Sequence, residues 1–228
     1  MVLVSEAECS AILRDPAGAA SFAEEALARA RNHGFAFWER RTKAILGWAS
    51  ALRTGARAGV REIREAIASA RSLGEERLVP WMLGLLSEAE LANGDPNAAE
   101  EAANEGLRWG ERNTLYRQYG FLLYTRGDAM VASGDRVQAE ADYHRALAGS
   151  RERNAKWIEL NAGIRLARLW QVDGRAEEAR DLLAPVYGWF TEGFDNPVLR
   201  DAKALLEELT GKSDSAAVSD RPTDASKS

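Results

Sequence analysis

Residues 86–99 read LSEAELANGDPNAA and residues 126–139 read RGDAMVASGDRVQA, which places Gly94 and Gly134 at the same point of two segments 40 positions apart. Between residues 41 and 188 this spacing occurs four times. It aligns three columns of mostly small residues and one turn position. The columns are Gly47, Ser87, Gly127, Ala167; then Gly59, Ala99, Ala139, Ala179; then Ala66, Gly106, Ala146, Val186; the turn position holds Thr54, Gly94, Gly134, Gly174. A period of this length is typical of solenoids, propellers and repeat arrays.

The columns indicate helical hairpins. Two helix backbones approach closely where the crossing position lacks bulk, and a glycine at the turn ends the first helix in the left-handed conformation at little steric cost. One hairpin cannot bury its apolar face alone, so the units are expected to stack into a solenoid. A HEAT-type array has a similar period, but the spacing of twelve and seven between the columns favours another helical repeat. A propeller is excluded because alternating β-branched strands are missing.

The second and third units resemble the tetratricopeptide repeat. The second carries Leu86-Ser87, Gly94-Asp95, Ala99 and Gly106-Leu107, and the third carries Gly127, Gly134-Asp135, Ala139, Tyr143 and Ala146-Leu147. Two features depart from that family. The period is 40 rather than about 34, and Arg126 stands where the consensus has leucine.

A longer resemblance covers most of the chain. Phe35-Ala36-Phe37-Trp38, Gly47-Trp48-Ala49, Ala167-Arg168-Leu169-Trp170 and residues 182–195, LLAPVYGWFTEGFD, look like the C-terminal repeat region of bacterial multidomain signalling proteins. Those proteins usually carry a class III nucleotide cyclase domain and a P-loop ATPase domain ahead of the repeats. The resemblance implies a repeat module, and it does not imply catalysis, because neither catalytic domain lies within these 228 residues.

The expected fold is all-α, a right-handed α-α superhelix of about five hairpins. We expect a repeat domain over residues 1–211, with a capping helix at 197–210 and a disordered tail at 212–228. The hairpins are predicted at 3–33, 35–72, 79–111, 114–151 and 155–190. Pro80 and Pro185 are expected to begin, kink or end the helices that contain them. The tail is rich in Ser, Asp, Ala and Thr and cannot bury enough apolar surface to become ordered.

Composition limits the partners. The formal net charge is −5, which argues against a nucleic-acid partner. No apolar run approaches the 18 or so residues that cross a membrane, and the N-terminal segment is too short for a signal peptide. The lone Cys9 cannot form an internal disulfide. A cytoplasmic protein is the simplest interpretation.

The sequence offers no clear catalytic, cofactor or metal site. Gly211-Lys212-Ser213 ends like a phosphate-binding loop, but Leu206 occupies the position where that loop needs glycine. His33, His144 and Cys9 are far apart, whereas zinc ligands come in close pairs. Adjacent carboxylates such as Glu100-Glu101 point about 100° apart on a helix, so a solvated face explains them better than a shared site. We therefore do not expect an enzyme.

The first helix of each hairpin should line the concave face, where large aromatic residues are typical anchors for a peptide or helix. An alternative explanation for Trp48 and Phe121 is packing between helices. The predicted partner-binding residues are Arg41, Trp48, Trp81, Glu88, Phe121, Tyr124, Asp128, Asn161 and Arg168.

The sequence thus predicts a non-catalytic scaffold that binds a protein or peptide on its concave face. The alternative is a regulatory or sensor region that acts on cyclase or ATPase domains in the same chain or in another. The identity of the partner, any sensed signal and the oligomeric state stay open at this point.

Overall fold

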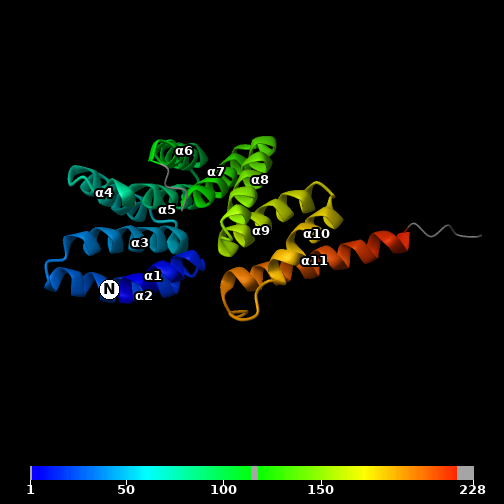
Figure 1. The fold of residues 1–228 in the computed structure, drawn as a ribbon, viewed down its shortest axis with the longest axis horizontal. Helices are drawn as coiled ribbons and strands as arrows, with labels where there is room; N and C mark the ends of the chain where they lie inside the picture. The colour runs from blue at the N-terminus through cyan, green and yellow to red at the C-terminus, as the bar shows by residue number, and fades with distance from the viewer. Residues whose placement is uncertain (1, 114–117, 220–228) are drawn as a thin grey trace, which may run out of the picture.

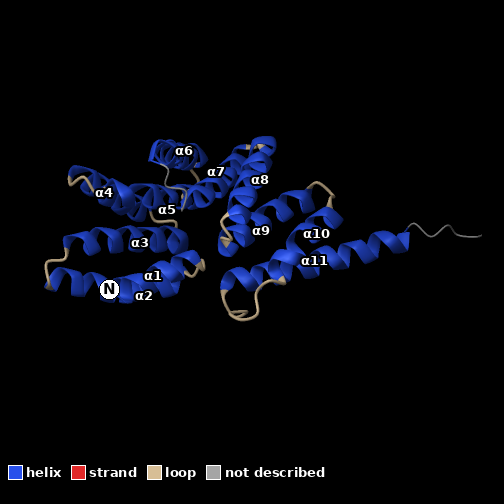
Figure 2. Ribbon diagram, viewed as in Figure 1, coloured by secondary structure: helices blue, strands red, loops and turns tan. Residues whose placement is uncertain are grey.

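The computed structural model describes residues 2–113 and 118–219, with side chains described except at 111–113 and 212–219. Within these ranges every regular element is a helix, and the structure has no strand (Figure 2). The elements are α1 (Val2–Ile12), α2 (Pro16–Asn32), α3 (Ala36–Thr54), α4 (Arg57–Ser72), a 3-10 turn η1 (Glu76–Leu78), α5 (Val79–Ala92), α6 (Pro96–Asn113), α7 (Tyr119–Ser133), α8 (Arg136–Glu152), α9 (Lys156–Val172), α10 (Ala176–Tyr187) and α11 (Pro197–Ser219).

Consecutive helices pair into the five predicted hairpins, and α11 packs on the last of them (Figure 1). The first helices of successive hairpins contact one another, from α1 to α3, α5, α7, α9 and finally α11. We call these six the inner helices. The second helices, α2, α4, α6, α8 and α10, are the outer helices, and each of them also contacts the next inner helix. This arrangement is an all-α, tetratricopeptide-like superhelix.

Helix bounds agree with the predicted ranges to within a few residues except at three places. α7 begins at Tyr119 rather than 114, and residues 114–117 lie outside the described residues. α10 ends at Tyr187 rather than 190, two residues after Pro185. The N–H groups of Trp189 and Phe190 bond three residues back, to Val186 and Tyr187, instead of four. α11 extends past 210 to Ser219, so residues 212–219 of the tail predicted at 212–228 are helical. Residues 220–228 of that tail lie outside the described residues.

The predicted turn column needs one correction. Gly94, Gly134 and Gly174 have left-handed backbones, as expected, but Thr54 is the last residue of α3. Gly55, one position later, takes the left-handed conformation with φ 63°. A β-branched threonine is strained at positive φ, so the helix extends by one residue to reach a glycine.

The small columns lie at close helix crossings. A Cβ added to Gly47 in α3 would lie 2.5 Å from the backbone oxygen of Gly59 in α4, and one added to Gly127 would lie 2.5 Å from the ring of Tyr143. Both distances are shorter than van der Waals contact allows, so these crossings exclude even a methyl group. The column therefore sets how closely the two helices of a hairpin pack.

The hydrogen bonds of Arg126 account for an arginine at a position where the repeat consensus has leucine. Its guanidinium donates two hydrogen bonds of 2.6 Å to Asp142, a carboxylate with no exposed surface, and a third of 2.8 Å to Asn104. A buried carboxylate requires such a partner. The change from leucine to arginine in α7 is thus matched by an aspartate in α8.

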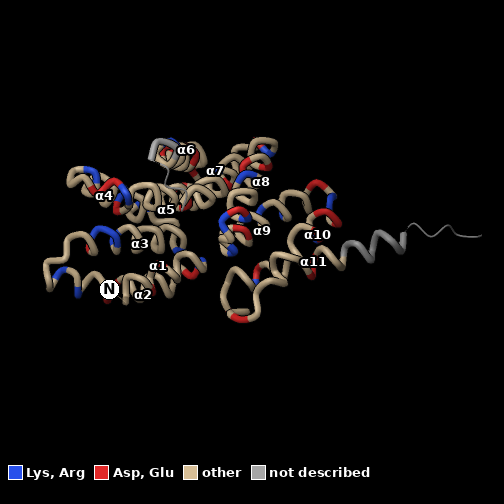
Figure 3. Tube along the Cα trace, viewed as in Figure 1, with Lys and Arg blue, Asp and Glu red and all other residues tan. Residues whose placement is uncertain are grey.

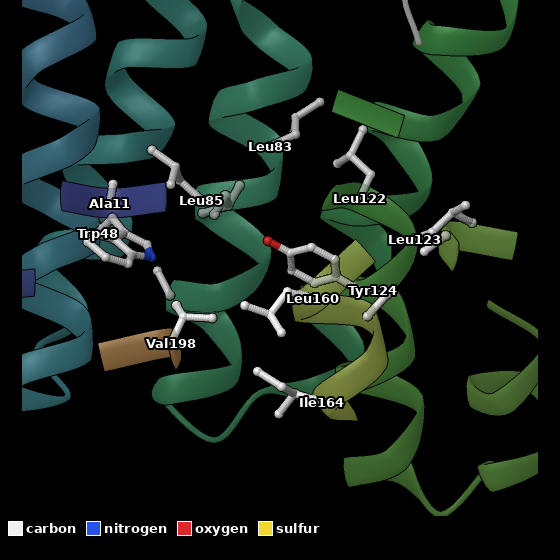
Figure 4. Packing of buried hydrophobic residues seen from close by; sticks show 14 of the residues in the cluster. Ala11, Trp48, Leu83, Leu85, Leu122, Leu123, Tyr124, Leu160, Ile164 and Val198 are labelled. Atoms are coloured by element: carbon white, nitrogen blue, oxygen red, sulfur yellow. The ribbon is translucent and has the colours of Figure 1, made fainter. Parts of the chain in front are cut away.

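The apolar core follows the inner helices without a break. Figure 4 shows Trp48 of α3, Tyr124 of α7 and Leu160 of α9 among the buried residues that join neighbouring hairpins. Charges of both signs are interspersed over the helices (Figure 3). No helix among the described residues has the length and apolar character needed to cross a membrane.

The crossings give a stability test. Ala139 is fully buried in its column, so Ala139→Leu should lower the free energy of unfolding by about 1–3 kcal/mol through overpacking. Ala141→Leu, the same change at an exposed position of α8, should stay within about 0.5 kcal/mol of the parent. Urea unfolding followed by circular dichroism measures both. Equal stability of the two variants would contradict the proposed register.

Candidate functional site

Two neighbouring cavities open on the side formed by the inner helices. The first, the aromatic cavity, has a volume of about 490 Å³ and is lined by Trp81, Phe121, Tyr124, Trp157 and Trp189, with Arg14, Glu88, Asn161 and Lys156 among its polar residues. The second, the basic cavity, has a volume of about 540 Å³, and its charged residues are Arg14, Arg136, Arg165, Arg168, Asp128 and Asp201. Both volumes fall within the range of ligand-binding sites. Arg14 and Asn161 belong to both linings and form their common border.

A buried carboxylate lies at the centre of this inner side. Glu88 of α5 is 8% exposed and accepts a 2.7 Å hydrogen bond from the indole N–H of Trp48. Its other oxygen forms an ion pair with Arg14, in the loop between α1 and α2. The guanidinium of Arg165 in α9 approaches the same oxygen to 3.9 Å. Glu88 thus connects hairpins that are far apart in the sequence.

Arg165 continues this network toward α7. Its Nε lies 2.8 and 2.9 Å from the two carboxylate oxygens of Asp128, and its guanidinium carbon lies 4.2 Å from the centroid of the Tyr124 ring. The Tyr143 hydroxyl donates a 2.8 Å hydrogen bond to Asp128. Burial lowers the pKa of Arg165, but Asp128, Tyr124 and Glu88 outweigh it and the pKa rises, so the guanidinium stays charged.

Two residues with strained backbone conformations line the aromatic cavity. Among the described residues, Arg14 and Asn154 are the non-glycine residues with positive φ, at 55° and 52°, and both line the aromatic cavity. Such conformations cost of order 1–3 kcal/mol and cluster at functional sites. Arg14 lies 40 positions before Thr54 and 80 before Gly94, in the turn column where the third, fourth and fifth units have glycine. The Arg14 side chain forms the ion pair with Glu88, which a glycine at this position could not form.

The predicted partner-binding residues divide into four groups. Trp81, Glu88, Phe121 and Tyr124 line the aromatic cavity, Asp128 and Arg168 line the basic cavity, and Asn161 lines both. Trp48 is fully buried, so it packs between helices and reaches the inner side through its hydrogen bond to Glu88. Arg41 lines neither cavity.

Arg41 instead takes part in contacts between neighbouring inner helices. It forms an ion pair with Glu8 of α1, and its guanidinium lies 5.6 Å from the centroid of the Trp81 ring. It therefore supports the aromatic cavity from behind through Trp81. The sequence placed it correctly on an inner helix but could not show that a neighbouring inner helix would cover it.

The prediction from the sequence did not include four residues that line the cavities, namely Arg14, Arg165, Trp157 and Trp189. Extending the turn column back by 40 residues would have found Arg14. Arg165 follows Asn161 by one helical turn, so the same face of α9 carries both. Trp189 lies in the loop after α10, where helical periodicity gives no prediction.

These residues offer groups that can form non-covalent contacts with a ligand. The cavities present aromatic rings, guanidinium groups, carboxylates and an amide. Among residues 2–113 and 118–219, no group of three or more His, Cys, Asp or Glu side chains gathers in a way that could hold a metal ion. Burial raises the pKa of Tyr124, which keeps its phenol protonated at neutral pH.

Comparison with known proteins bears on the fold. No model of a protein family matches the sequence, and no curated protein matches it. Among solved structures, the fold is similar to that of a Rap protein complexed with competence and sporulation factor, with a TM-score of 0.61 and 14% sequence identity. The match covers 92% of this chain but 63% of the Rap chain. At this level of identity the similarity establishes a tetratricopeptide-like helical repeat fold.

The Glu88 network gives a second test. Glu88→Ala leaves the Trp48 N–H buried without its acceptor and removes one partner of Arg14 and Arg165. The free energy of unfolding should fall by about 2–4 kcal/mol. Glu24→Ala, at an exposed glutamate of α2, should change it by less than about 0.5 kcal/mol. Urea titration compares the two, and a loss at Glu88 no larger than that at Glu24 would show that the network does not stabilise the fold.

Proposed function

We propose that this protein is a non-catalytic, tetratricopeptide-like scaffold that binds a segment of a protein or peptide partner on its inner side. The observation that carries this proposal is the aromatic cavity, which α5, α7, α9 and the loop after α10 build together. A partner side chain that enters it would be surrounded by rings from several hairpins. Enclosed aromatic pockets of this kind are where binding energy concentrates in protein interfaces.

The walls of the cavity are held in place before any partner binds. Phe121 lies against Gly84, where no side chain would fit, and its ring centroid is 5.4 Å from that of Tyr124. The Trp157 ring lies 4.9 Å from that of Phe190. Preorganised walls reduce the entropy lost on binding. Trp189 differs, because 54% of its surface is exposed at the cavity edge, and it is available to cover a bound side chain.

The polar residues of the cavity supply orientation. Lys156 lies 5.7 Å from the Trp189 ring centroid, and the Asn161 amide donates to the Trp157 carbonyl at 2.9 Å, which leaves its oxygen directed to Arg165 at 3.3 Å. An apolar centre with a polar rim is the usual organisation of a protein-binding patch.

We also infer that the protein works in the cytoplasm, which accords with its single cysteine.

A second candidate function is regulation of a cyclase or ATPase, in the same chain or in another. One observation favours it. Residues 182–195, which carry the resemblance to the bacterial signalling proteins, form the end of α10 and the loop that brings Trp189 to the aromatic cavity. The most specific sequence motif of the chain is therefore part of the candidate binding site.

This second function has its own test. The purified chain should neither hydrolyse ATP nor form cyclic nucleotides, because its cavities lack a phosphate-binding loop and a nucleophile with an adjacent base. An in-frame cyclase or ATPase segment upstream of Met1 in the genome would support regulation within one chain. Nucleotide turnover by the purified chain would contradict both proposed functions.

The binding proposal is tested with Trp189. Selection of a phage-displayed random peptide library on the purified protein should enrich peptides with a large apolar residue. Trp189→Ala should weaken the tightest of them by about 2 kcal/mol or more, roughly 30-fold, as measured by fluorescence anisotropy. Phe194→Ala, on the same loop but outside the cavity, is the matched control and should retain affinity. Failure to enrich any peptide, or equal effects of the two changes, would contradict the proposal.

A further inference from the structure

The charges of the two cavities are satisfied within the protein. Each cation among the described lining residues has a carboxylate partner. The pairs are Arg14 with Glu88, Arg136 with Asp173, Arg165 with Asp128, Arg168 with Asp201 and Lys156 with Glu159. An ionised ligand group would have to break one of these pairs or lose its water without gaining a counter-ion, and both are costly. The cavities therefore favour an uncharged ligand group.

Two rings of the aromatic cavity already have a cation of the protein beside them. The guanidinium carbon of Arg165 lies 4.2 Å from the centroid of the Tyr124 ring. The ammonium group of Lys156 lies 5.7 Å from the centroid of the Trp189 ring. A ligand cation placed on either ring would be close to a like charge, so repulsion would oppose the cation–π attraction. An uncharged ring has no such cost and can stack on the walls or pack against them edge to face.

A hydroxyl that has no partner among the described residues belongs to the lining of the aromatic cavity. It is that of Tyr124, a residue only 5% exposed. The hydroxyl points from α7 toward Leu85 of α5, which lines the same cavity (Figure 4). Tyr143 differs, because its buried hydroxyl donates to Asp128. Buried tyrosine hydroxyls usually have a hydrogen-bond partner, so the Tyr124 hydroxyl is available to a ligand.

This hydroxyl discriminates between uncharged rings. A ligand N–H can donate to the Tyr124 oxygen, as the indole N–H of Trp48 donates to Glu88 at 2.7 Å within the protein. A hydrocarbon ring would displace water from the hydroxyl and offer no hydrogen bond in return. Leaving a buried polar group unpaired costs more than a neutral hydrogen bond gains. The cavity therefore favours a ring with a donor on its edge.

We propose that the partner segment inserts a tryptophan side chain into the aromatic cavity, where its indole N–H donates a hydrogen bond to the Tyr124 hydroxyl. This inference rests on the proposed function and names the side chain that the cavity selects. Tryptophan joins a large apolar ring to one N–H donor and carries no charge. Tyrosine also has a donor, but its smaller ring would leave more of the cavity of about 490 Å³ without contacts.

Synthetic hexapeptide sets test which side chain is selected. Every peptide has an acetylated N-terminus, an amidated C-terminus and only Gly, Ser, Ala or Asn at the randomised positions. One central residue is fixed as Trp, Tyr, Phe, Lys or Glu, so the sets differ at that residue alone. Each set is incubated with the purified full chain, and retained peptides are identified by mass spectrometry. We expect the strongest retention from the Trp set, and no retention from the Lys and Glu sets.

The hydrogen bond is tested by removing either of its two groups. In the tightest Trp peptide, 3-benzothienylalanine in place of Trp keeps a bicyclic ring but exchanges the N–H for sulfur. This exchange and Tyr124→Phe should each weaken binding about tenfold, because each leaves the other group unpaired. The two changes together should cost no more than either alone. Tyr187→Phe, at a tyrosine of α10 outside both cavities, is the matched control and should leave the affinity unchanged.

Fluorescence anisotropy measures these affinities. Tyr124→Phe keeps the ring that packs against Phe121 and Arg165, so the variant should fold. Urea unfolding of the variant and the parent checks this expectation.

Several outcomes would overturn the inference. Stronger retention of any other set than of the Trp set would show that the cavity selects a different side chain. Additive losses from the benzothienyl exchange and Tyr124→Phe would show that the two groups do not bond each other. N-acetyltryptophanamide that binds as tightly as the best Trp peptide would indicate a site for a free indole compound. Retention of no set, while the phage selection does enrich peptides, would refute the inference alone, whereas failure of both would contradict the proposed function.

Discussion

The close approach of two helices within each hairpin is the constraint on which the rest of the structure depends. At Gly47 and Gly59 the backbones are so near that neither position has room for a methyl group. Such crossings limit the distance between helices. The other hairpins have buried serine or alanine at these positions, such as Ser87 with Ala99 and Ala167 with Ala179, so small residues recur at the crossing every 40 residues. The curvature that results turns six helices toward one side. Helix packing therefore creates the surface on that side, and the side chains that line it determine what it can bind.

A chain of polar contacts then links the units across this inner side. Arg14, Trp48, Glu88, Asp128 and Arg165 come from the first, second, third, fourth and fifth hairpins in turn, and each contacts Glu88 or Arg165. A nearest-neighbour stack would leave the first and fifth hairpins independent of each other. Here the first and last units contribute to one cavity, because Arg14 in the loop after α1 and Pro197 at the beginning of α11 both line the basic cavity. Buried charges are costly to separate, so this network favours one curvature of the superhelix.

Much of the fold could be predicted because the repeated positions hold residues that strongly influence the conformation of the nearby backbone. Glycine at a turn, Asp95-Pro96 at a helix start and alanine at a crossing act within a few positions, and the helices they delimit agree with the prediction. The inner face of α5, α7 and α9 followed from the same period, which is why Glu88, Tyr124 and Asp128 were identified as candidates. Residues that act through long-range packing could not be assigned in this way. Trp48 and Arg41 are covered by neighbouring helices, and Trp189 reaches the cavity from an irregular loop.

The central claim is that a partner peptide binds between the inner helices and places an apolar side chain in the aromatic cavity. A crystal structure of the protein with its tightest selected peptide tests this most directly. The account predicts an apolar side chain of the peptide among Trp81, Tyr124 and Trp189. A peptide bound along the outer helices, with both cavities unchanged, would contradict it.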